Sequence, residues 1–382
     1  MSNTMIKRKI EREIQQYLDS TEKKILFIWG PRRSGKTTLL KKYAEILKEN
    51  IFNFDFISDQ QLFKSDRTIL EKIAKEHKVI LIDEVQNYPE STKVLKLLHD
   101  EFNIKIIATG SSELRKKGQD FDSLSGRFLE LYCLPLNMEE IVGYKNPKSY
   151  DVSHFTQTEL KECIKYGNYP EVYLLKEESQ KIDLLENIFN TFVLKDVMNI
   201  YDLKDAKLAK DILQKIALQI GSEVSLREIA SSLQANVGTV TSYIEIFIQN
   251  YVLIQIPSFK TNLRKSVSEN KKYYFLDLGI RNALIKDFRD LDLRQDKGGV
   301  FENFIISEVF KKKKNNNLSL NLYFYREYSG KEVDLVIENY KKQYRTFEIK
   351  LSETIAKSVF PLESKNENIN IENYFEQIEK LL

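Results

Sequence analysis

The sequence has few cysteines and histidines and no long apolar run. Its 382 residues include two cysteines, Cys133 and Cys163, and three histidines. These small numbers exclude a disulfide scaffold and a zinc cluster of the usual Cys/His spacing, so a bound metal ion needs carboxylate ligands. No run approaches the roughly 18 apolar residues of a membrane span, and residues 1–13 lack the apolar core of a signal peptide. We therefore expect a soluble, cytoplasmic protein in reducing surroundings, with no membrane partner.

An excess of charge of one sign is also missing. There are 59 Lys and Arg residues against 56 Asp and Glu residues, which leaves a net charge of +3. This balance excludes a uniformly basic nucleic-acid binder, although a local basic surface stays possible. Hydrophobic residues make up 42% and charged residues 30% of the chain, as in ordinary globular proteins. The length predicts two or three domains, each large enough for its own core.

Apolar runs alternate with helical patterns in the first part of the chain. The runs are KKILFIWG at residues 23–30, KVILIDE at 78–84 and IKIIATGSS at 104–112, and IFNFDF from residue 51 predicts a further strand. Continuous apolar runs of this length favour a parallel sheet that is covered on both faces. We therefore predict an α/β domain, built on such a sheet, over residues 1–148.

The region 149–285 changes to helical patterns with polar breaks. Residues 225–256 read as two short amphipathic helices followed by a strand, which is typical of a winged helix-turn-helix. The basic segment 260–272 is the predicted wing. The presumed recognition helix carries no Arg or Lys and includes Glu245, which favours a packing or protein-contact role over DNA reading. Wing cations that could contact DNA phosphates are Lys260, Arg264, Lys265, Lys271 and Lys272.

The strongest motif is GPRRSGKT at residues 30–37, which fits the P-loop pattern GxxxxGK[ST] between a predicted strand and a predicted helix. Glycines let backbone N–H groups wrap around phosphates, and the helix N-terminus adds its positive dipole end. Lys36 is expected to reach the β and γ phosphates of ATP, and the Thr37 hydroxyl to bind Mg²⁺. The predicted nucleotide-binding residues are Gly30, Pro31, Arg32, Arg33, Ser34, Gly35, Lys36, Thr37 and Thr38.

Polar residues after the next two apolar runs complete this predicted site. Asp83 is expected to hold Mg²⁺ from a strand adjacent to the P-loop strand, and Glu84 to polarise the attacking water. Ser111 and Ser112 are candidates to sense the γ-phosphate, with a helix N-cap as the alternative. Arg127 is a candidate to neutralise transition-state charge, in its own subunit or in a neighbouring one, with a surface ion pair as the alternative.

A second set of polar residues lies in the region 286–382. A helix is predicted over about 299–314, followed by the strand-like runs NLYFYRE, EVDLVIE and RTFEIKL. Glu348 and Lys350 share one face of their strand and can meet Asp334 across a hairpin. Together with Glu302 they are a candidate Mg²⁺-dependent nuclease site, and a structural ion-pair cluster is the alternative.

The motifs together resemble a prokaryotic family of AAA+-related, STAND-like P-loop ATPases. The resemblance rests on GPRRSGKTTLL, ILIDEVQ, ATGSSELR and SGRFLELYCLPLNMEE in the first part of the chain. It continues with YGNYPEV and YFLDLGI in the middle and with GGVFENF, EVDLVI and FEIKLS near the end. The resemblance implies a P-loop domain joined to a winged-helix region and a C-terminal restriction-endonuclease-like domain with a PD-(D/E)xK-type site, here at residues 286–382.

Three functional hypotheses follow from these residues. The first is an ATP-binding and ATP-hydrolysing switch that uses Mg²⁺ and sets the arrangement of the winged-helix and nuclease-like domains. The second is an ATP-gated, Mg²⁺-dependent DNA nuclease, and the third is a non-catalytic regulator that binds DNA or protein and is stabilised by ATP. A protein partner, DNA and a homo-oligomer are the partners considered, and Arg127 acting on a neighbouring subunit would require the oligomer.

Overall fold

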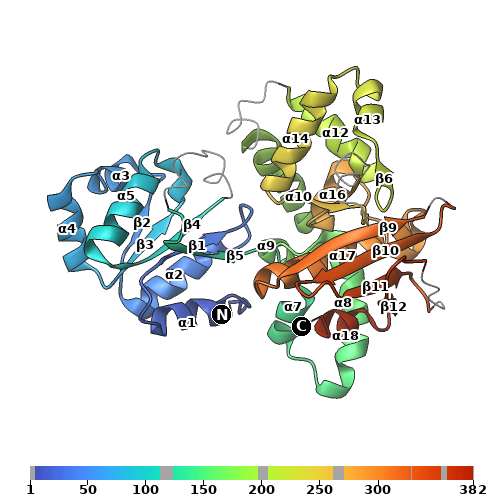
Figure 1. Cartoon of the computed structure of the whole chain (residues 1–382), viewed down its shortest axis with the longest axis horizontal. Helices are drawn as coiled ribbons and strands as arrows, with labels where there is room; N and C mark the ends of the chain where they lie inside the picture. Colours follow the sequence, from blue (N-terminus) through green and yellow to red (C-terminus); the bar gives the residue numbers. More distant parts are fainter. Residues whose placement is uncertain are drawn as a thin grey trace. The chain divides into compact units, whose positions relative to one another are not determined.

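The computed structural model describes residues 5–111, 124–196, 205–260, 271–327, 329–353 and 359–381, without the side chains of 194–196. It divides the chain into two compact units, one formed by Lys7–Leu134 and the other by Met1–Ile6 with Pro135–Leu382 (Figure 1). The chain therefore passes between the units twice, at residues 6–7 and at residues 134–135. The boundary near residue 285 that separates a middle from a last domain stays a prediction.

The unit Lys7–Leu134 is built on a parallel five-stranded sheet with the order β2-β3-β4-β1-β5. The runs at 23–30, 51–56, 78–84 and 104–112 supply four of these strands, as predicted, and residues 128–132 supply an unpredicted fifth. Every residue of β1 and β3 is buried, because helices cover both faces of the sheet. The strands are β1 (Ile25–Trp29), β2 (Ile51–Asn53), β3 (Val79–Asp83), β4 (Lys105–Gly110) and β5 (Phe128–Tyr132).

The helices of this unit follow the strands in alternation. Leu39, Leu40 and Tyr43 of α2 pack with Leu26 and Ile28 of β1 in one core. The α4 helix begins at an Asp66 N-cap, whose side chain accepts from the backbone N–H groups of its first turn. The helices are α1 (Glu11–Asp19), α2 (Lys36–Leu47), α3 (Ile57–Leu62), α4 (Arg67–Glu76) and α5 (Ser91–Leu97), with the short turns η1 (Val85–Asn87) and η2 (Leu98–Phe102).

The other unit begins with helices and a small antiparallel sheet of order β6-β8-β7. One apolar core joins these elements. The first helices are α7 (Met138–Lys145), α8 (Val152–Tyr166), α9 (Pro170–Leu174) and α10 (Glu178–Ile188), with η4 (Ser149–Asp151) and η5 (Phe189–Asp196). They are followed by α12 (Ala206–Leu218), β6 (Glu223–Val224), α13 (Leu226–Ser232), α14 (Val237–Gln249), β7 (Leu253–Pro257), β8 (Lys271–Phe275) and α16 (Leu278–Ile285).

The YGNYP and DLG motifs meet in this core. Gly167 has a φ of +71°, and a Cβ there would lie 2.0 Å from Asp277 Oδ1, so only glycine fits. The Asp277 carboxylate accepts from the backbone N–H of Asn168 at 2.6 Å and caps α16 through the N–H of Ile280 at 3.2 Å. These motifs therefore join two segments that are about a hundred residues apart, and their contacts are structural.

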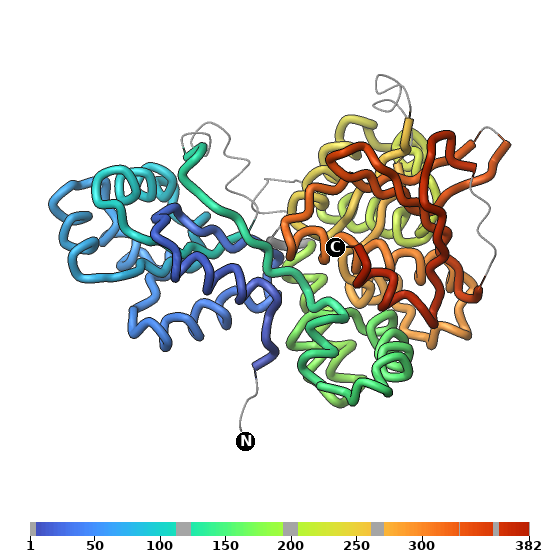
Figure 2. The backbone as a smooth tube through the Cα atoms, turned by 60° about the horizontal axis from the view of Figure 1, so that its bottom comes forward, coloured from blue at the N-terminus to red at the C-terminus, as the bar shows by residue number. Residues whose placement is uncertain are grey.

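The C-terminal part of the same unit, coloured orange to red in Figure 2, is one long helix and a mixed four-stranded sheet, in which the strand order is β12-β11-β10-β9. β11 is antiparallel to β10 and parallel to β12. Asn303 of α17 binds both backbone groups of Phe275, so the long helix is fastened along β8. The elements are η6 (Leu291–Leu293), α17 (Lys297–Asn315), β9 (Leu320–Arg326), β10 (Glu332–Asn339), β11 (Tyr344–Ile349), β12 (Ser364–Ile369) and α18 (Tyr374–Glu379).

The predicted fold class is confirmed at the level of an α/β protein with a parallel P-loop-like sheet, a helical middle region and a C-terminal mixed sheet. Among the described residues, no helix is both long enough and apolar enough to cross a membrane.

Candidate functional site

The predicted phosphate-binding loop connects the end of β1 to the start of α2. A Cβ at Gly30 would lie 2.0 Å from the Cys133 carbonyl oxygen, so this position has room only for glycine. Gly35 is the N-cap of α2 and has a φ of +100°. Residues other than glycine rarely adopt this left-handed backbone conformation. The two glycines of the motif are therefore required by a close approach and by a left-handed turn, and the loop lies at the positive end of the α2 dipole.

Lys36 is buried inside this loop. Its Nζ donates to the carbonyl oxygens of Gly30 at 2.8 Å and Pro31 at 2.9 Å. Burial lowers the pKa of Lys36, and the attraction of the Glu84 carboxylate offsets this effect in part. The ammonium is thus held by neutral groups in a desolvated place, where an anionic ligand would stabilise its charge.

Two serine hydroxyls of the predicted site are buried without a hydrogen-bond partner among the described residues. They are Ser34 in the loop and Ser111 after β4. Buried hydroxyl groups are normally hydrogen-bonded, and orphan ones mark places where a ligand or water completes the network. Thr37 and Thr38 are exposed on the first turn of α2, Arg32 is half-buried and Arg33 is exposed. Ser112 lies outside the described residues.

Asp83 and Glu84 stand at the end of β3, on the same edge of the sheet as the loop. The register pairs Ile82 with Ala108 on β4, and Thr109 donates its hydroxyl to the buried Asp83 carboxylate. The prediction of an adjacent strand is corrected here, because β4 lies between β3 and β1. Thr109 belongs to this intervening strand and contacts Asp83 from it.

Glu84 adopts a left-handed backbone with φ 54°. Gln86 donates from Nε2 to the Glu84 carboxylate, and its Oε1 accepts from the Ser111 backbone N–H at 3.3 Å. One amide side chain therefore connects the end of β3 with the end of β4. The sequence contains this residue in the Val-Gln of ILIDEVQ, but its bridging role is visible only in the structure.

Arg127 lies at the opposite edge of the sheet. It directly precedes β5, whose Tyr132 is the residue level with Trp29 at the end of β1. Its Nε donates to Asp100 Oδ1 at 2.7 Å. A five-residue strand spans about 16 Å, so Arg127 does not face the loop of its own subunit, and the surface ion pair is what the structure contains. An action on a neighbouring subunit stays a prediction.

The four residues of the predicted C-terminal site converge. Lys350 Nζ lies 3.0 Å from Asp334 Oδ2 and 3.6 Å from Glu348 Oε1, across the β10–β11 hairpin. The Ile349 backbone N–H also donates to Asp334 at 2.8 Å. Glu302 of α17 and Asp334 belong to one carboxylate group whose ligand atoms lie within 4.8 Å of one another.

Three further residues complete this cluster and were not predicted in it. Glu332 is the third carboxylate of the group. Lys272 Nζ lies 3.0 Å from Glu302 Oε1 and also contacts Glu332 Oε1. The Tyr274 hydroxyl donates to Glu302 as well. The alternation of strands places Glu332 beside Asp334 and Lys272 beside Tyr274, so sequence periodicity could have suggested each pair but not that the pairs meet.

The predicted wing role of Lys272 is therefore wrong. Its side chain is only 1% exposed, and the attraction of Glu302 and Glu332 outweighs the effect of burial and raises its pKa. Lys271 is half-buried, with Nζ 3.3 Å from Gln255 Oε1. Lys260 is half-buried, while Arg264 and Lys265 lie outside the described residues. An ammonium already occupies the place between Glu302 and Glu332, so these two carboxylates do not fit a divalent cation as they stand.

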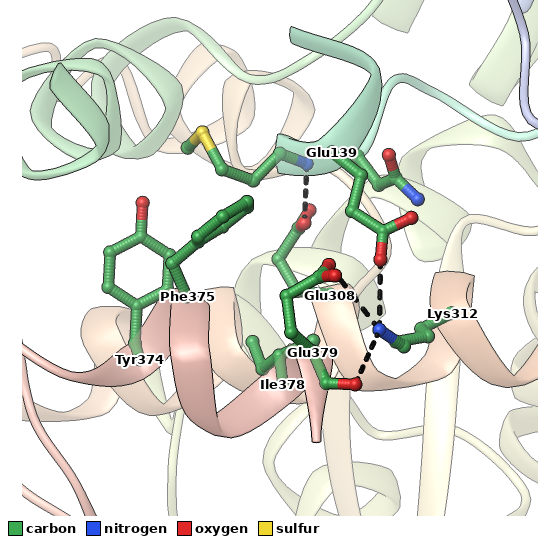
Figure 3. A pocket seen from close by; sticks show the side chains of 9 residues that line it. Glu139, Glu308, Lys312, Tyr374, Phe375, Ile378 and Glu379 are labelled. Atoms are coloured by element: carbon green, nitrogen blue, oxygen red, sulfur yellow. Dashed lines mark hydrogen bonds and ion pairs between the residues drawn. The ribbon is translucent and has the colours of Figure 1, made fainter. Parts of the chain in front are cut away.

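A third buried lysine lies between α7, α17 and α18 (Figure 3). Lys312 Nζ contacts the carboxylates of Glu139 at 2.8 Å and Glu379 at 3.4 Å. Burial and the neighbouring Glu139 raise the pKa of Glu379 to about 7. Glu308, one turn before Lys312, accepts from the Met138 backbone N–H at 2.7 Å. A small pocket there is lined by these charged groups together with apolar side chains of α7 and α18.

The parallel sheet, the glycine-bounded loop and the buried Lys36 define the first unit as a P-loop nucleotide-binding domain. A family described as an AAA domain matches residues 22–142, and two families described as domains of unknown function match 157–292 and 297–373. The chain thus carries an AAA-type P-loop ATPase domain followed by two domains of unknown function.

Relatives with similar sequences are found in bacteria and archaea. An uncharacterized protein of Haemophilus influenzae is 28% identical over 306 residues, which cover 75% of each chain. An uncharacterized protein of Methanocaldococcus jannaschii is 29% identical, covering 92% of this chain and 82% of that one. The Walker-type ATPase of Pyrococcus abyssi has a similar structure, with a TM-score of 0.50 and 14% identity over 74% of this chain and 97% of that chain. At this identity the structural likeness shows the fold alone.

Proposed function

We propose that this chain is an ATP-binding and ATP-hydrolysing switch protein in which the nucleotide state of the P-loop unit acts on the unit Pro135–Leu382. The observation that carries the proposal is the buried Lys36, held by the carbonyl oxygens of Gly30 and Pro31 beside the orphan hydroxyls of Ser34 and Ser111. Phosphate oxygens would replace those neutral acceptors and would give the two hydroxyls partners.

The remaining groups have roles that fit this chemistry. The Glu84 carboxylate, oriented by Gln86, is placed to align and polarise the attacking water. Thr37 and Asp83 offer the oxygen ligands that Mg²⁺ prefers, and they are the residues that would hold it. Bound Mg²⁺ would supply neutralisation of phosphate charge. Ser111, connected to Glu84 through Gln86, would report whether the γ-phosphate is present.

ATP binding is the direct test of this proposal. The purified chain is titrated with a fluorescent, slowly hydrolysed ATP analogue in Mg²⁺, together with Lys36→Ala and the control Lys41→Ala, an exposed lysine of the same helix. We expect tight binding by the wild type and the control, and loss of binding in Lys36→Ala. Equal binding by Lys36→Ala would contradict the proposal, and binding without any hydrolysis by the wild type would favour an ATP-stabilised regulator.

We also propose that residues 205–275 form a winged-helix module that contacts a protein partner. The order α12, β6, α13, α14, β7, β8 supports this interpretation. The exposed side of α14 carries Thr239, Ser242, Glu245 and Gln249, which include no cation to bind DNA phosphates. DNA binding by the full chain at several salt concentrations is the test. A steep decrease with salt would show phosphate contacts and favour a DNA-binding role.

Cleavage of DNA by the C-terminal sheet is the alternative function. The convergence of Asp334, Glu348 and Lys350 favours a restriction-endonuclease-like site there. The ammonium of Lys272 opposes it, because it pairs with Glu302 and Glu332. We therefore propose a non-catalytic sheet, for which supercoiled DNA stays intact with ATP and Mg²⁺ or Mn²⁺. Nicking by the wild type that Asp334→Ala abolishes would instead establish the ATP-gated nuclease.

A further inference from the structure

Arg8 is a buried arginine that neither the P-loop motif nor the comparisons assign to the site. It precedes α1, and its side chain lies against the phosphate-binding loop. Its Nη1 donates to the Ser34 carbonyl oxygen at 2.6 Å and lies 3.3 Å from Cys133 Sγ. Its Nη2 donates to the Leu134 carbonyl oxygen. The guanidinium therefore joins the loop to the segment that follows β5.

The contact with Ser34 sets the direction of one peptide group of the loop. In a trans peptide the carbonyl and the following N–H point in opposite directions. Because the Ser34 carbonyl points at Arg8, the Gly35 N–H points away from it, as the phosphate-binding N–H groups of such loops must. A Cβ at Gly35 would lie 3.3 Å from Arg8 Nη1, so this guanidinium is also packed closely against the turn.

The contact with Leu134 connects the loop to the place where the chain leaves the unit. Leu134 is the last residue of the P-loop unit, and Arg8 is the second residue after the other crossing at residues 6–7. The Cys133 backbone is also close to the loop, since its N–H donates to the Trp29 carbonyl oxygen at 2.7 Å and its oxygen faces Gly30. The Arg8 side chain thus joins both connecting segments to the loop, and the Cys133 backbone adds a direct contact from the second segment.

The position of Arg8 itself is well determined. Its backbone N–H donates to Glu11 Oε1 at 2.8 Å, and the other oxygen of Glu11 pairs with Lys42 of α2. This bonding ties the start of α1 to the helix that follows the loop. A planar guanidinium with several donors can hold two carbonyl oxygens in a fixed geometry, which a lysine ammonium does less well.

We propose that Arg8 is a positioning residue that aligns the phosphate-binding loop and transmits its state to the segment at Leu134. This inference rests on the proposed ATP binding. When nucleotide fills the loop, the Ser34–Gly35 peptide and the Arg8 guanidinium move or stiffen together, and the change reaches both connecting segments. Among the described contacts, the groups that respond are therefore the Arg8 guanidinium and the carbonyl groups of Ser34 and Leu134.

The test uses the full chain with Lys72→Cys and Lys341→Cys, two exposed positions in different units, labelled with a donor and an acceptor dye. Arg8→Ala, Arg8→Lys and the exposed control Lys7→Ala are compared by affinity for the ATP analogue and by the change in energy transfer on binding. We expect Arg8→Ala to bind at least about tenfold more weakly, the loss expected for a charge-assisted hydrogen bond, and to show no change in energy transfer at saturation. Arg8→Lys should recover part of the affinity but not the change in energy transfer.

The outcomes separate this inference from the proposed function. If the wild type does not bind the analogue, the proposed function fails. If the wild type binds and responds, and Arg8→Ala matches it within about twofold in affinity with a full change in energy transfer, Arg8 has no such role. A full change in energy transfer at saturation in a weakly binding Arg8→Ala would overturn the connection to Leu134. Thermal melting of each variant checks that it is folded, and Arg8→Lys keeps the test open if Arg8→Ala does not fold.

Discussion

Two buried lysines, Lys36 and Lys272, show how differently the two predicted sites are built. Lys36 is 4% and Lys272 1% exposed, so both ammonium groups are removed from water. Lys36 donates to two carbonyl oxygens, whereas Lys272 contacts two carboxylates. Burial lowers the pKa of the first, and the nearby carboxylates outweigh burial and raise the pKa of the second. The same residue type therefore has neutral acceptors in one place and carboxylate partners in the other.

The partners of the two lysines indicate which of the two sites is prepared for a ligand. A buried charge whose hydrogen-bond partners are neutral is costly, and a ligand that supplies the opposite charge recovers part of that cost on binding. The P-loop holds such a charge, because the partners of Lys36 are neutral. Around Lys272 the counter-charges come from Glu302 and Glu332, which belong to the same unit, so neither an anion nor a divalent cation gains as much there.

The largest effect is expected for Glu84→Gln. The phosphate cradle around Lys36 is unchanged, so the affinity for the ATP analogue should stay within about twofold of wild type. Loss of the water-polarising carboxylate should lower kcat by roughly 10²- to 10⁴-fold, as for a general base. Phosphate release at saturating ATP measures it, and Glu90→Gln, an exposed acid nearby, is the control. Wild-type turnover in Glu84→Gln would remove this residue from its role.

Lys272→Ala should destabilise the second unit strongly. It leaves the buried Glu302 and the half-buried Glu332 without their ammonium, and breaking a buried ion pair typically costs about 3–5 kcal/mol in the free energy of unfolding. Urea unfolding is the measurement. The neighbouring Lys271→Ala is the control and should cost less than about 1 kcal/mol, because Lys271 pairs with a neutral amide. Equal losses of unfolding free energy in the two variants would show that Lys272 does not form a stabilising ion pair with Glu302 and Glu332.

Lys350→Ala should change the free energy of unfolding by about 1 kcal/mol or less. This lysine contacts the same cluster at Asp334, but its side chain is 44% exposed, and water screens the ion pair. Asp334 also keeps the backbone N–H of Ile349 as a donor. Lys365→Ala, which removes an exposed lysine that pairs with Glu367, is the matched control. A loss as large as that of Lys272→Ala would mean that the cluster depends on both lysines alike.

The smallest effect is expected at Glu379, where Lys312 serves two carboxylates at once (Figure 3). Burial and Glu139 raise the pKa of Glu379 from its usual 4.5 to about 7, so between these pH values the folded protein binds more protons than the unfolded chain. The free energy of unfolding should therefore fall as the pH rises from about 5 to 8. Glu379→Gln should reduce this slope in urea unfolding at several pH values. The effect is small because the side chain is 41% exposed, and an unchanged slope would show that Glu379 titrates normally.

The sequence pattern predicted much of the fold because the relevant signals are local. Three of the predicted runs contain the parallel strands β1, Ile25–Trp29, β3, Val79–Asp83, and β4, Lys105–Gly110, and the helix predicted at about 299–314 is α17, Lys297–Asn315. The strands that were not predicted carry weaker patterns. β5 is FLELY, with only two buried residues, and β12 is the polar SKNENI. These strands form by pairing with β1 and β11, which no local pattern records.

The sites divide in the same way. The chemistry of the P-loop is contained in eight consecutive residues, because a loop that wraps phosphates needs its glycines and its lysine at a set spacing. The sequence alone therefore determined that this is a nucleotide-binding chain. Only the tertiary structure decided the partners of Lys272, Arg127 and Arg8. Lys272 and Glu332 are 60 residues apart, and Arg8 and Leu134 are 126 apart. Whether a charged side chain meets phosphate, carboxylate or a backbone carbonyl depends on which distant segments pack against it, and that packing is a property of the whole fold.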